Sequence, residues 1–222
     1  MLACDLHVHS SYSRDGESSV EEILLRAEKA GLDVIAITDH DTVEGVLHAQ
    51  HCTTPLVVIP GIEISTRQGH LIALGITGLV PPGLDVLETV RIARSMGALV
   101  ILPHPFHMWR HGVALKLQEA LSAVDAVEVF NSRYIVGSAN RKAVRVARKL
   151  GKPVVGGSDA HNARFVGFGR TYVDADRNVA AVLTAIREGR TRVGGRMTPL
   201  QTYTRQSIRN TWKKFKRRVR FR

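Results

Sequence analysis

The sequence has few cysteines and no long hydrophobic run. Cys4 and Cys52 are its only cysteines among 222 residues, too few for a disulfide framework in a chain of this size, which favours a reducing compartment. The longest apolar runs, such as residues 97–102, fall far short of the roughly 18 residues that a membrane-spanning helix needs, and no basic and then apolar leader precedes Asp5. We therefore expect neither export nor membrane insertion and predict a cytoplasmic protein.

The last part of the sequence lacks acidic residues, and this locates the net charge. The chain has a formal charge of +11, but residues 190–222 hold 12 of its 31 Lys and Arg and no Asp or Glu. Residues 1–189 therefore carry 19 basic and 20 acidic side chains and are nearly neutral. The basicity belongs to an appended element, so it does not predict a nucleic-acid-binding fold throughout the chain.

Repeats, low-complexity tracts and internal linkers are also missing before residue 195, so we expect one globular domain. Short β-branched runs alternate with amphipathic helical patterns, which predicts an α/β fold of parallel βαβ units. The expected strands are 2–9, 33–38, 56–64, 70–76, 98–102, 126–130 and 153–157. The expected helices are a capped segment between Ser18 and Gly31, then 42–50, 84–96, 113–123, 136–150 and 179–188.

Histidines and other polar residues stand where these strands end. The carboxyl ends of the strands in a β/α barrel converge on one face, where active sites of such folds are built. Residues far apart in the sequence would meet there. They are His7, His9, His40, Glu63, His104, Asn131, Asp159 and His161.

The residue types at these ends favour a metal site. Side chains two apart in a strand share a face, so one ion can take both His7 and His9. A lone His-x-His pair is equally consistent with two structural histidines in a core. Five imidazoles and two carboxylates in one cavity would be poorly solvated without a cation, and His with Asp or Glu is a ligand set for Zn, Mn or Fe.

Six segments of the sequence resemble the ordered motifs of the PHP (polymerase and histidinol phosphatase) metal-dependent phosphoesterases. They are DLHVHSSYSRDG, AITDHDTVEG, GIEIS, ILPHP, EVFN and GSDAH. The resemblance spans residues 4–190. It implies a distorted seven-stranded (β/α)7 barrel of the TIM-like kind in a single PHP domain over residues 1–195, followed by a basic C-terminal extension over residues 196–222.

The resemblance also implies a cluster of two or three divalent ions, Mn, Zn or Fe. The ligands of one ion would be His7, His9, Glu63 and Asp159. Glu63 would bridge to a second ion, whose other ligands would be His104 and His70. The third site would consist of Asp15, His40 and His161.

The activity implied by the resemblance is hydrolysis of a phosphate ester. Metals lower the pKa of bound water and neutralise charge on the phosphate, so a metal-bound hydroxide would be the nucleophile. The residues expected to act in catalysis are Glu63, Asp159 and His161. The family that the sequence resembles includes phosphatases, so we expect the substrate to be a small phosphorylated molecule or a nucleotide.

A phosphate substrate also needs donors other than metals. Arginine can bind phosphate through two parallel hydrogen bonds, and we expect Arg133, Arg14 and Arg170 to bind substrate because they lie in loops near ligands or strand ends. Asn131 ends a strand and could face the same cavity. The alternative for each arginine is a solvated surface charge.

The C-terminal extension has an amphipathic helical pattern within residues 205–222. Ile208, Trp212, Phe215 and Val219 recur at helical spacing among Lys and Arg. Three interpretations remain open: a helix on an anionic membrane surface, an arm that binds RNA or DNA, or a helix docked on the barrel with a solvated cationic face. The sequence does not identify which protein partners the chain has.

Three functions follow from these features. The first is a metal-dependent phosphoesterase acting on a phosphate monoester or nucleotide. The second is a nuclease that trims short RNA or DNA with help from the basic extension. The third is a non-catalytic nucleic-acid or membrane adaptor with a structural metal cluster. The intact ligand set argues against it, because a structural site saturates its metal with protein ligands, whereas a catalytic site keeps open positions.

Overall fold

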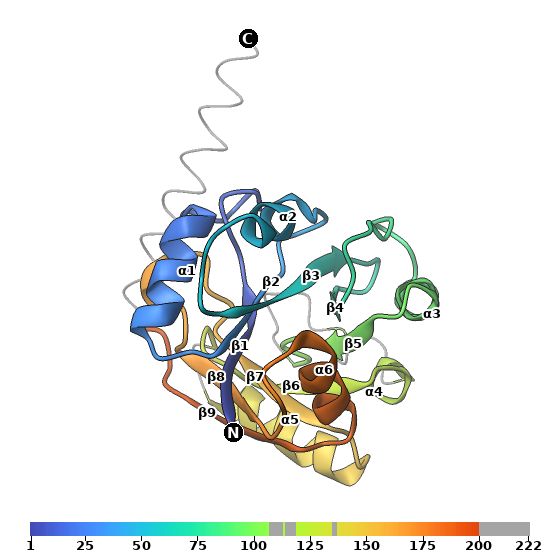
Figure 1. Cartoon of the computed structure of the whole chain (residues 1–222). Coiled ribbons are helices and arrows are strands. Elements are labelled where there is room, and N and C mark those ends of the chain that lie inside the picture. Colours follow the sequence, from blue (N-terminus) through green and yellow to red (C-terminus); the bar gives the residue numbers. More distant parts are fainter. Residues whose placement is uncertain (107–112, 114–118, 135–136, 200–222) are drawn as a thin grey trace.

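The computed structural model describes residues 1–106, 113, 119–134 and 137–199, and these form a nearly closed, nine-stranded sheet with helices packed around it (Figure 1). The strands are β1 (Leu2–Val8), β2 (Val34–Ile37), β3 (Val57–Ser65), β4 (His70–Leu74), β5 (Leu99–Leu102), β6 (Ala126–Asn131), β7 (Val154–Gly157), β8 (Gly169–Val173) and β9 (Thr191–Gly195). The helices are α1 (Val20–Lys29), α2 (Glu44–Gln50), α3 (Val86–Ser95), α4 (Glu119–Ala123), α5 (Ser138–Lys149) and α6 (Val179–Arg187).

Helix starts follow the capping signals in the sequence. Ser19 is the N-cap of α1: its hydroxyl accepts the backbone N–H of Glu22 and the Glu22 carboxylate accepts that of Ser19. Asn178 caps α6 by accepting the N–H of Ala181 at 2.8 Å. Such caps pair N–H groups that have no partner inside the helix. Of the helix expected over 113–123, residues 119–123 form α4, and residues 114–118 lie outside the described residues.

The sheet is mixed, whereas the alternation of strands and helices predicts parallel units only. The pairs β1–β2, β2–β3, β5–β6 and β6–β7 are parallel, but β4 runs antiparallel to both β3 and β5. The four residues between Ser65 and His70 are too few for a crossover, so β3 and β4 form a hairpin. As a result His70, at the start of β4, pairs with Ser65 at the end of β3.

Two strands were not expected from the sequence. β8 pairs antiparallel with β1, and β9 with β8, so the described residues contain nine strands where the family resemblance implied seven. β8 (GRTYV) and β9 (TRVGG) are short and rich in Gly and polar residues, which depresses the strand signal. The barrel-like α/β architecture agrees with the expectation, and the strand number does not.

The carboxyl ends of β1 and β7 approach each other, and this contact nearly closes the sheet. The backbone N–H of His9 donates to the carbonyl of Ala160 at 2.8 Å, just beyond the two strands. The buried hydroxyl of Thr171 both donates to the carbonyl of Gly156 and accepts its N–H, each at 2.8 Å. A Cβ atom on Gly169 would lie 2.0 Å from the Gly157 carbonyl oxygen, so only glycine permits this approach of β8 to β7.

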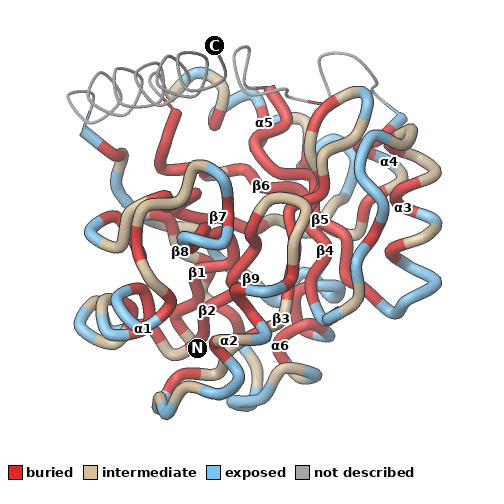
Figure 2. The backbone as a smooth tube through the Cα atoms, turned by 90° about the horizontal axis from the view of Figure 1, so that it is seen from above, coloured by how far each residue is buried: buried red, intermediate tan, exposed pale blue. Residues whose placement is uncertain are grey.

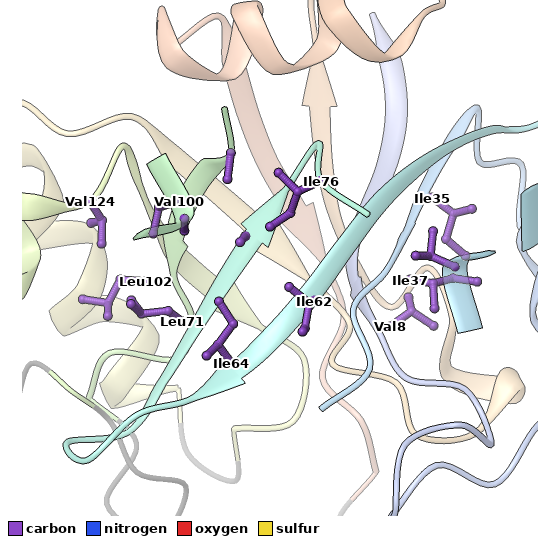
Figure 3. Close-up of a cluster of buried hydrophobic side chains, with 14 of the residues drawn as sticks. Val8, Ile35, Ile37, Ile62, Ile64, Leu71, Ile76, Val100, Leu102 and Val124 are labelled. Atoms are coloured by element: carbon purple, nitrogen blue, oxygen red, sulfur yellow. The ribbon is translucent and has the colours of Figure 1, made fainter. Parts of the chain in front are cut away.

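Two clusters of apolar side chains cover the two faces of the sheet. The larger packs the outer face against the helices, and Figure 3 shows part of it, with Val8, Ile35 and Ile37 together on one side of the view. The smaller joins Cys4, Leu6 and other strand residues to the apolar side of α6. Seen from above, the buried strands are surrounded by helices whose outer surfaces are exposed (Figure 2). Because Cys4 and Leu6 precede His7 in β1, α6 packs nearer the amino end of that strand.

The ordered packing continues beyond residue 195, where the domain was expected to end. Arg196 donates its backbone N–H to Phe168, and its guanidinium lies 3.9 Å from the centre of the Phe168 ring. Thr198 is buried and hydrogen-bonds to the backbone and the hydroxyl of Ser132. The amphipathic stripe of residues 205–222 lies outside the described residues, so its three interpretations stay predictions.

We predict that Thr171→Val destabilises the protein by roughly 2–4 kcal/mol, because it leaves a buried N–H and a buried carbonyl of Gly156 without this partner at almost unchanged volume. Urea denaturation of the wild type and the variant measures the difference. Thr184→Val, at an exposed position of α6, is the matched control and should change the free energy of unfolding little. Equal stability of all three proteins would contradict the role given to Thr171.

Candidate metal centre

The strand ends bring nine side chains into one cluster, which we call the central cluster. All are buried or partly buried, and they come from β1, β3, β4 and the segments that follow β1, β2, β5 and β7. They are the nine residues expected to bind metal: His7, His9, Asp15, His40, Glu63, His70, His104, Asp159 and His161.

A bulge in β1 helps to aim His7 into the cluster. Asp5 pairs with Ile35 and Val8 with Ile37, so two residues of β1 stand opposite one residue of β2. Val8, Ile35 and Ile37 all belong to the outer apolar cluster. The two residues between the pairs, Leu6 and His7, are thereby turned away from that face, and a bulge of this kind commonly re-aims a side chain.

Four ligand atoms lie at the spacing of a single metal site. His7 Nε2, His9 Nε2 and Glu63 Oε2 are each 3.1 Å from one another. Asp159 Oδ1 lies 3.8 Å from His7 Nε2 and 3.6 Å from His9 Nε2. Ligand atoms bound at ~2.0–2.2 Å in a tetrahedral site lie ~3.3–3.6 Å apart, so these four atoms surround a space of suitable size.

The second oxygen of Glu63 faces a different pair of histidines. Glu63 Oε1 lies 3.0 Å from His70 Nδ1 and 3.2 Å from His104 Nε2. Glu63 Oε2 also lies 3.5 Å from His40 Nδ1. The carboxylate is thus shared between two groups of imidazoles, an arrangement in which one side chain can bridge two ions.

A third group lies at the more exposed side of the cluster. Asp15 Oδ2 is 3.1 Å from His161 Nε2 and 3.9 Å from His40 Nε2. The ring of His9 lies between the rings of His40 and His161. Its centroid is 4.6 Å from that of His40 and 4.2 Å from that of His161. Asp15 is 27% exposed, whereas the side chains of His9 and Glu63 are at most 1% exposed.

The donor set fits metal ions because the cluster needs positive charge. Glu128 accepts a hydrogen bond from His7 Nδ1 at 3.0 Å, so a neutral His7 ring would keep its lone pair on Nε2, which faces Glu63 and His9. Burial opposes protonation of His7, but Glu63, Glu128 and Asp159 raise its pKa well above the usual value. His9 Nδ1 and His40 Nδ1 are buried without a hydrogen-bond partner. A cation among these atoms would compensate both the carboxylates and the inward lone pairs.

Two of the histidines have lowered pKa values and are neutral at physiological pH. Burial lowers the pKa of His40 to about 4. Burial, together with the positive charge of Arg133, lowers the pKa of His161 to about 3. Burial alone would raise the pKa of Glu63, yet the surrounding histidines, His40 first, hold it well below its usual range. A neutral imidazole and an ionised carboxylate are the forms that bind a metal.

Two ligands adopt backbone conformations that are unfavourable for their residue types. His104 has φ of 31° and Asp159 has φ of 52°. Non-glycine residues in this region carry a strain of order 1–3 kcal/mol, and such residues concentrate at functional sites. Each stands two residues beyond the end of a strand, where the chain turns while the side chain points into the cluster.

Glu128 is the residue of the site that the sequence analysis missed. Its Oε1 accepts His7 Nδ1, and its Oε2 accepts the backbone N–H of His104 at 2.8 Å and Asn131 Nδ2 at 2.9 Å. It therefore fixes two ligands from different strands. The signal in the sequence is a single acid inside the otherwise apolar segment AVEVF.

The four predicted substrate-binding residues lie in different surroundings. Arg133 is buried beside Asp159 Oδ1 at 3.4 Å and His161 Nδ1. Asn131 donates through Nδ2 to Glu128 and Asp159, so its amide supports ligands. Arg14 is exposed next to Asp15. Arg170 instead donates to the carbonyls of Gly167 and Ala30, each at 2.8 Å, which ties the segment after β7 to α1.

Two aspartates near the histidines in sequence accept hydrogen bonds from the loops around the cluster. Asp5 accepts the backbone N–H groups of Ser158 and Gly167 at 3.0 and 2.8 Å. Asp39 accepts the N–H and the hydroxyl of Ser10, both at 2.6 Å. They position the loops that carry ligands, because the segments after β1 and β7 are fixed by these bonds.

The fold and the cluster define a barrel-like α/β protein with a buried group of side chains that could hold metal ions. The family model described as "PHP domain" matches residues 5–103, and one described as "PHP-associated" matches residues 137–191. An uncharacterized protein of Methanocaldococcus jannaschii is 34% identical over 162 residues, covering 67% of this chain and 94% of that protein. The chain belongs to the PHP family.

Relatives with named activities match shorter stretches. A 5'-3' exoribonuclease of Haemophilus influenzae is 34% identical over 103 residues, 44% of this chain and 37% of the enzyme. A phosphoribosyl 1,2-cyclic phosphate 1,2-diphosphodiesterase of Eggerthella lenta is 38% identical over 80 residues, 32% of this chain and 30% of the enzyme. The matches therefore span about a third of the length of these two enzymes.

A solved structure shows the same fold. A two-domain protein from Bacteroides vulgatus, described as containing a predicted PHP-like metal-dependent phosphoesterase, superposes with a TM-score of 0.67 at 23% identity, covering 88% of this chain and 65% of that one. In the described part of the present chain, none of the helices has the length and apolar character needed to cross a bilayer.

We predict that Glu128→Gln lowers the affinity of the central cluster for Mn²⁺ or Zn²⁺ roughly 10–100-fold, because one of the three N–H donors that Glu128 accepts would meet an amide NH2 group. Metal titration with a competing chelator measures this, and circular dichroism checks that the variant folds. Glu119→Gln, at an exposed acid of α4, is the control. Wild-type affinity in Glu128→Gln would show that Glu128 does not support the ligands.

Proposed function

We propose that the protein is a metal-dependent hydrolase of phosphoric ester bonds whose substrate is a phosphate monoester or a nucleotide. The observation that carries this proposal is the carboxylate of Glu63, whose two oxygens face two separate groups of imidazoles at 3.0–3.2 Å. Two neighbouring divalent ions suit attack on a phosphate. The named activities of the two relatives, both on phosphodiester bonds, support the same reaction class.

The proposed metal ions would lower the pKa of water and neutralise negative charge on the phosphate. The residues of the chain orient this machinery. Glu128 holds the proton of His7 on Nδ1, so that Nε2 keeps its lone pair. Asn131 and Arg133 hold Asp159 from two directions through Nδ2 and the guanidinium. Because these supports are buried, the ligands stay in place before any substrate arrives.

The differences in exposure indicate the direction from which substrate approaches. Asp15 is 27% and His70 15% exposed, whereas His7 and His9 are at most 1% exposed. We propose that the phosphate enters on the side of Asp15 and His70. Arg14, which is exposed beside Asp15, would contact the substrate first. The buried Arg133 would bind the phosphate group that is hydrolysed.

We predict metal-dependent release of phosphate from small esters or nucleoside phosphates. His9→Ala and Asp159→Ala should each lower kcat/KM more than about 100-fold, beyond the effect usual for residues that only orient a ligand. A panel of small phosphate esters, nucleoside mono- and bisphosphates and short RNAs, assayed with added Mn²⁺ or Zn²⁺ and with chelator, measures this.

The controls separate loss of the site from loss of the fold. His51→Ala and Asp176→Ala change exposed residues of the same types and should keep full activity. If metal-loaded wild-type protein turned over no ester in the panel while binding metal tightly, the protein would instead be an adaptor with a structural metal cluster.

A nuclease is the second candidate, and the surface of α5 favours it. The helix carries five basic side chains, all exposed, and no acidic one: Arg141, Lys142, Arg145, Arg148 and Lys149. Arg141, Arg145 and Arg148 follow one another at helical spacing, so they line one side. A row of cations binds the phosphates of a nucleic acid strand in a salt-dependent way.

For this candidate we predict that replacing Arg141, Arg145 and Arg148 by Ala raises KM for short RNA and weakens its dependence on salt, with kcat/KM for a small ester unchanged. Removal of residues 205–222 should act in the same direction if the extension also binds RNA. The control replaces the exposed Arg91, Arg187 and Arg192. Equal RNA cleavage by all these proteins would exclude a role of α5 in holding the strand.

A further inference from the structure

A second group of metal-ligand side chains lies on the outer surface, apart from the central cluster. Glu21 is in the first turn of α1, His48 is in the last turn of α2, and Cys52 follows that helix. The two helices cover neighbouring parts of the sheet (Figure 1). No residue of this group belongs to any of the PHP motifs in the sequence.

The three side chains are close enough to share one ion. His48 Nε2 lies 2.9 Å from Glu21 Oε1. One ligand atom from each of Glu21, His48 and Cys52 lies within 4.8 Å of the other two. The ligand atoms of a tetrahedral zinc site lie ~3.3–3.8 Å apart, so a small rotation of these half-buried or exposed side chains suffices to bind an ion.

The orientation of His48 is fixed on its other side. The hydroxyl of Tyr12 lies 3.3 Å from His48 Nδ1, and the two rings meet edge to face with centroids 5.9 Å apart. When Nδ1 donates its proton to Tyr12, Nε2 presents its lone pair toward Glu21 and Cys52. A histidine that binds a metal is commonly held in this way through its second nitrogen.

We propose that Glu21, His48 and Cys52 form a peripheral zinc site. A thiolate, an imidazole and a carboxylate are all ligands that Zn²⁺ takes, and the thiolate disfavours Mg²⁺, Ca²⁺ and Mn²⁺, which suit oxygen ligands. Three protein ligands leave the fourth position to water. The exposure of Glu21 and His48, 58% and 37%, lets an ion reach the site from solution.

Zinc at this site would act on the loop between β1 and α1. It would join α1 to α2 directly, and through His48 it would hold Tyr12. The same loop carries Asp15, which faces His40 and His161 in the central cluster. The peripheral zinc site thereby restrains a segment that contributes a ligand to the central cluster.

Cobalt binding to the full chain tests the site, because Co²⁺ replaces Zn²⁺ and absorbs through a thiolate charge-transfer band only where a cysteine is a ligand. The central cluster offers histidines and carboxylates, and Cys4, the other cysteine, is fully buried. We expect the band in the wild type and its loss on addition of Zn²⁺ and in Cys52→Ser. His51→Gln removes an exposed imidazole beside the site and should retain the band.

Further variants keep the test decisive if Cys52→Ser does not fold. His48→Gln and Glu21→Gln should weaken binding of Co²⁺, and Tyr12→Phe should weaken it roughly 10-fold by releasing His48. Zn²⁺ should also protect Cys52 from alkylation. Absence of the band in the wild type, its persistence in Cys52→Ser, or wild-type binding in His48→Gln would overturn the proposal.

Discussion

The buried carboxylate of Glu63 is the group on which the central cluster depends. A negative charge with 1% exposure is costly unless positive charge or hydrogen bonds compensate it, and here five histidines lie within 3.5 Å of its oxygens. An imidazole nitrogen that faces Glu63 compensates the negative charge only if that nitrogen carries a proton or shares a metal ion with the carboxylate. The second alternative also uses the lone pairs that face inward, so metal binding satisfies the whole cluster where protonation satisfies only part of it.

The direction of β4 makes this arrangement possible. Had β4 run parallel to β3, His70 at its start would lie at the opposite edge of the sheet. The β3–β4 hairpin instead puts His70 next to Ser65, two residues from Glu63. A short local connection therefore supplies the second oxygen of Glu63 with a partner that parallel topology could not deliver.

The sequence predicted the site better than the sheet around it. His7, His40 and Asp159 stand at the ends of short apolar runs that alternate with helical patterns, which predicts parallel strands whose carboxyl ends converge. The strands β8 and β9 escaped prediction, since their place depends on the pairing of β8 with β1 and of β9 with β8, and not on their own composition. Glu128 escaped for a related reason: its role comes from contacts with His7 in β1 and His104 after β5, which no local pattern records. Arg170, expected in a loop, lies in β8, and its guanidinium donates to the carbonyl of Ala30 at the end of α1, because the direction of a side chain depends on tertiary packing.

The strain and the polar crowding of the central cluster must be offset by the rest of the fold. His104 and Asp159 carry left-handed backbone conformations, and His9 and His40 bury nitrogens without hydrogen bonds. The favourable free energy that offsets these costs comes from the two apolar clusters on the faces of the sheet. Their packing holds the strands together independently of the polar side chains at the strand ends. Ions that bind only the folded chain stabilise it by mass action, so metal binding at the central cluster would be coupled to folding. The nearly closed sheet therefore holds the candidate ligands from six strands close together even when no cation compensates their negative charge.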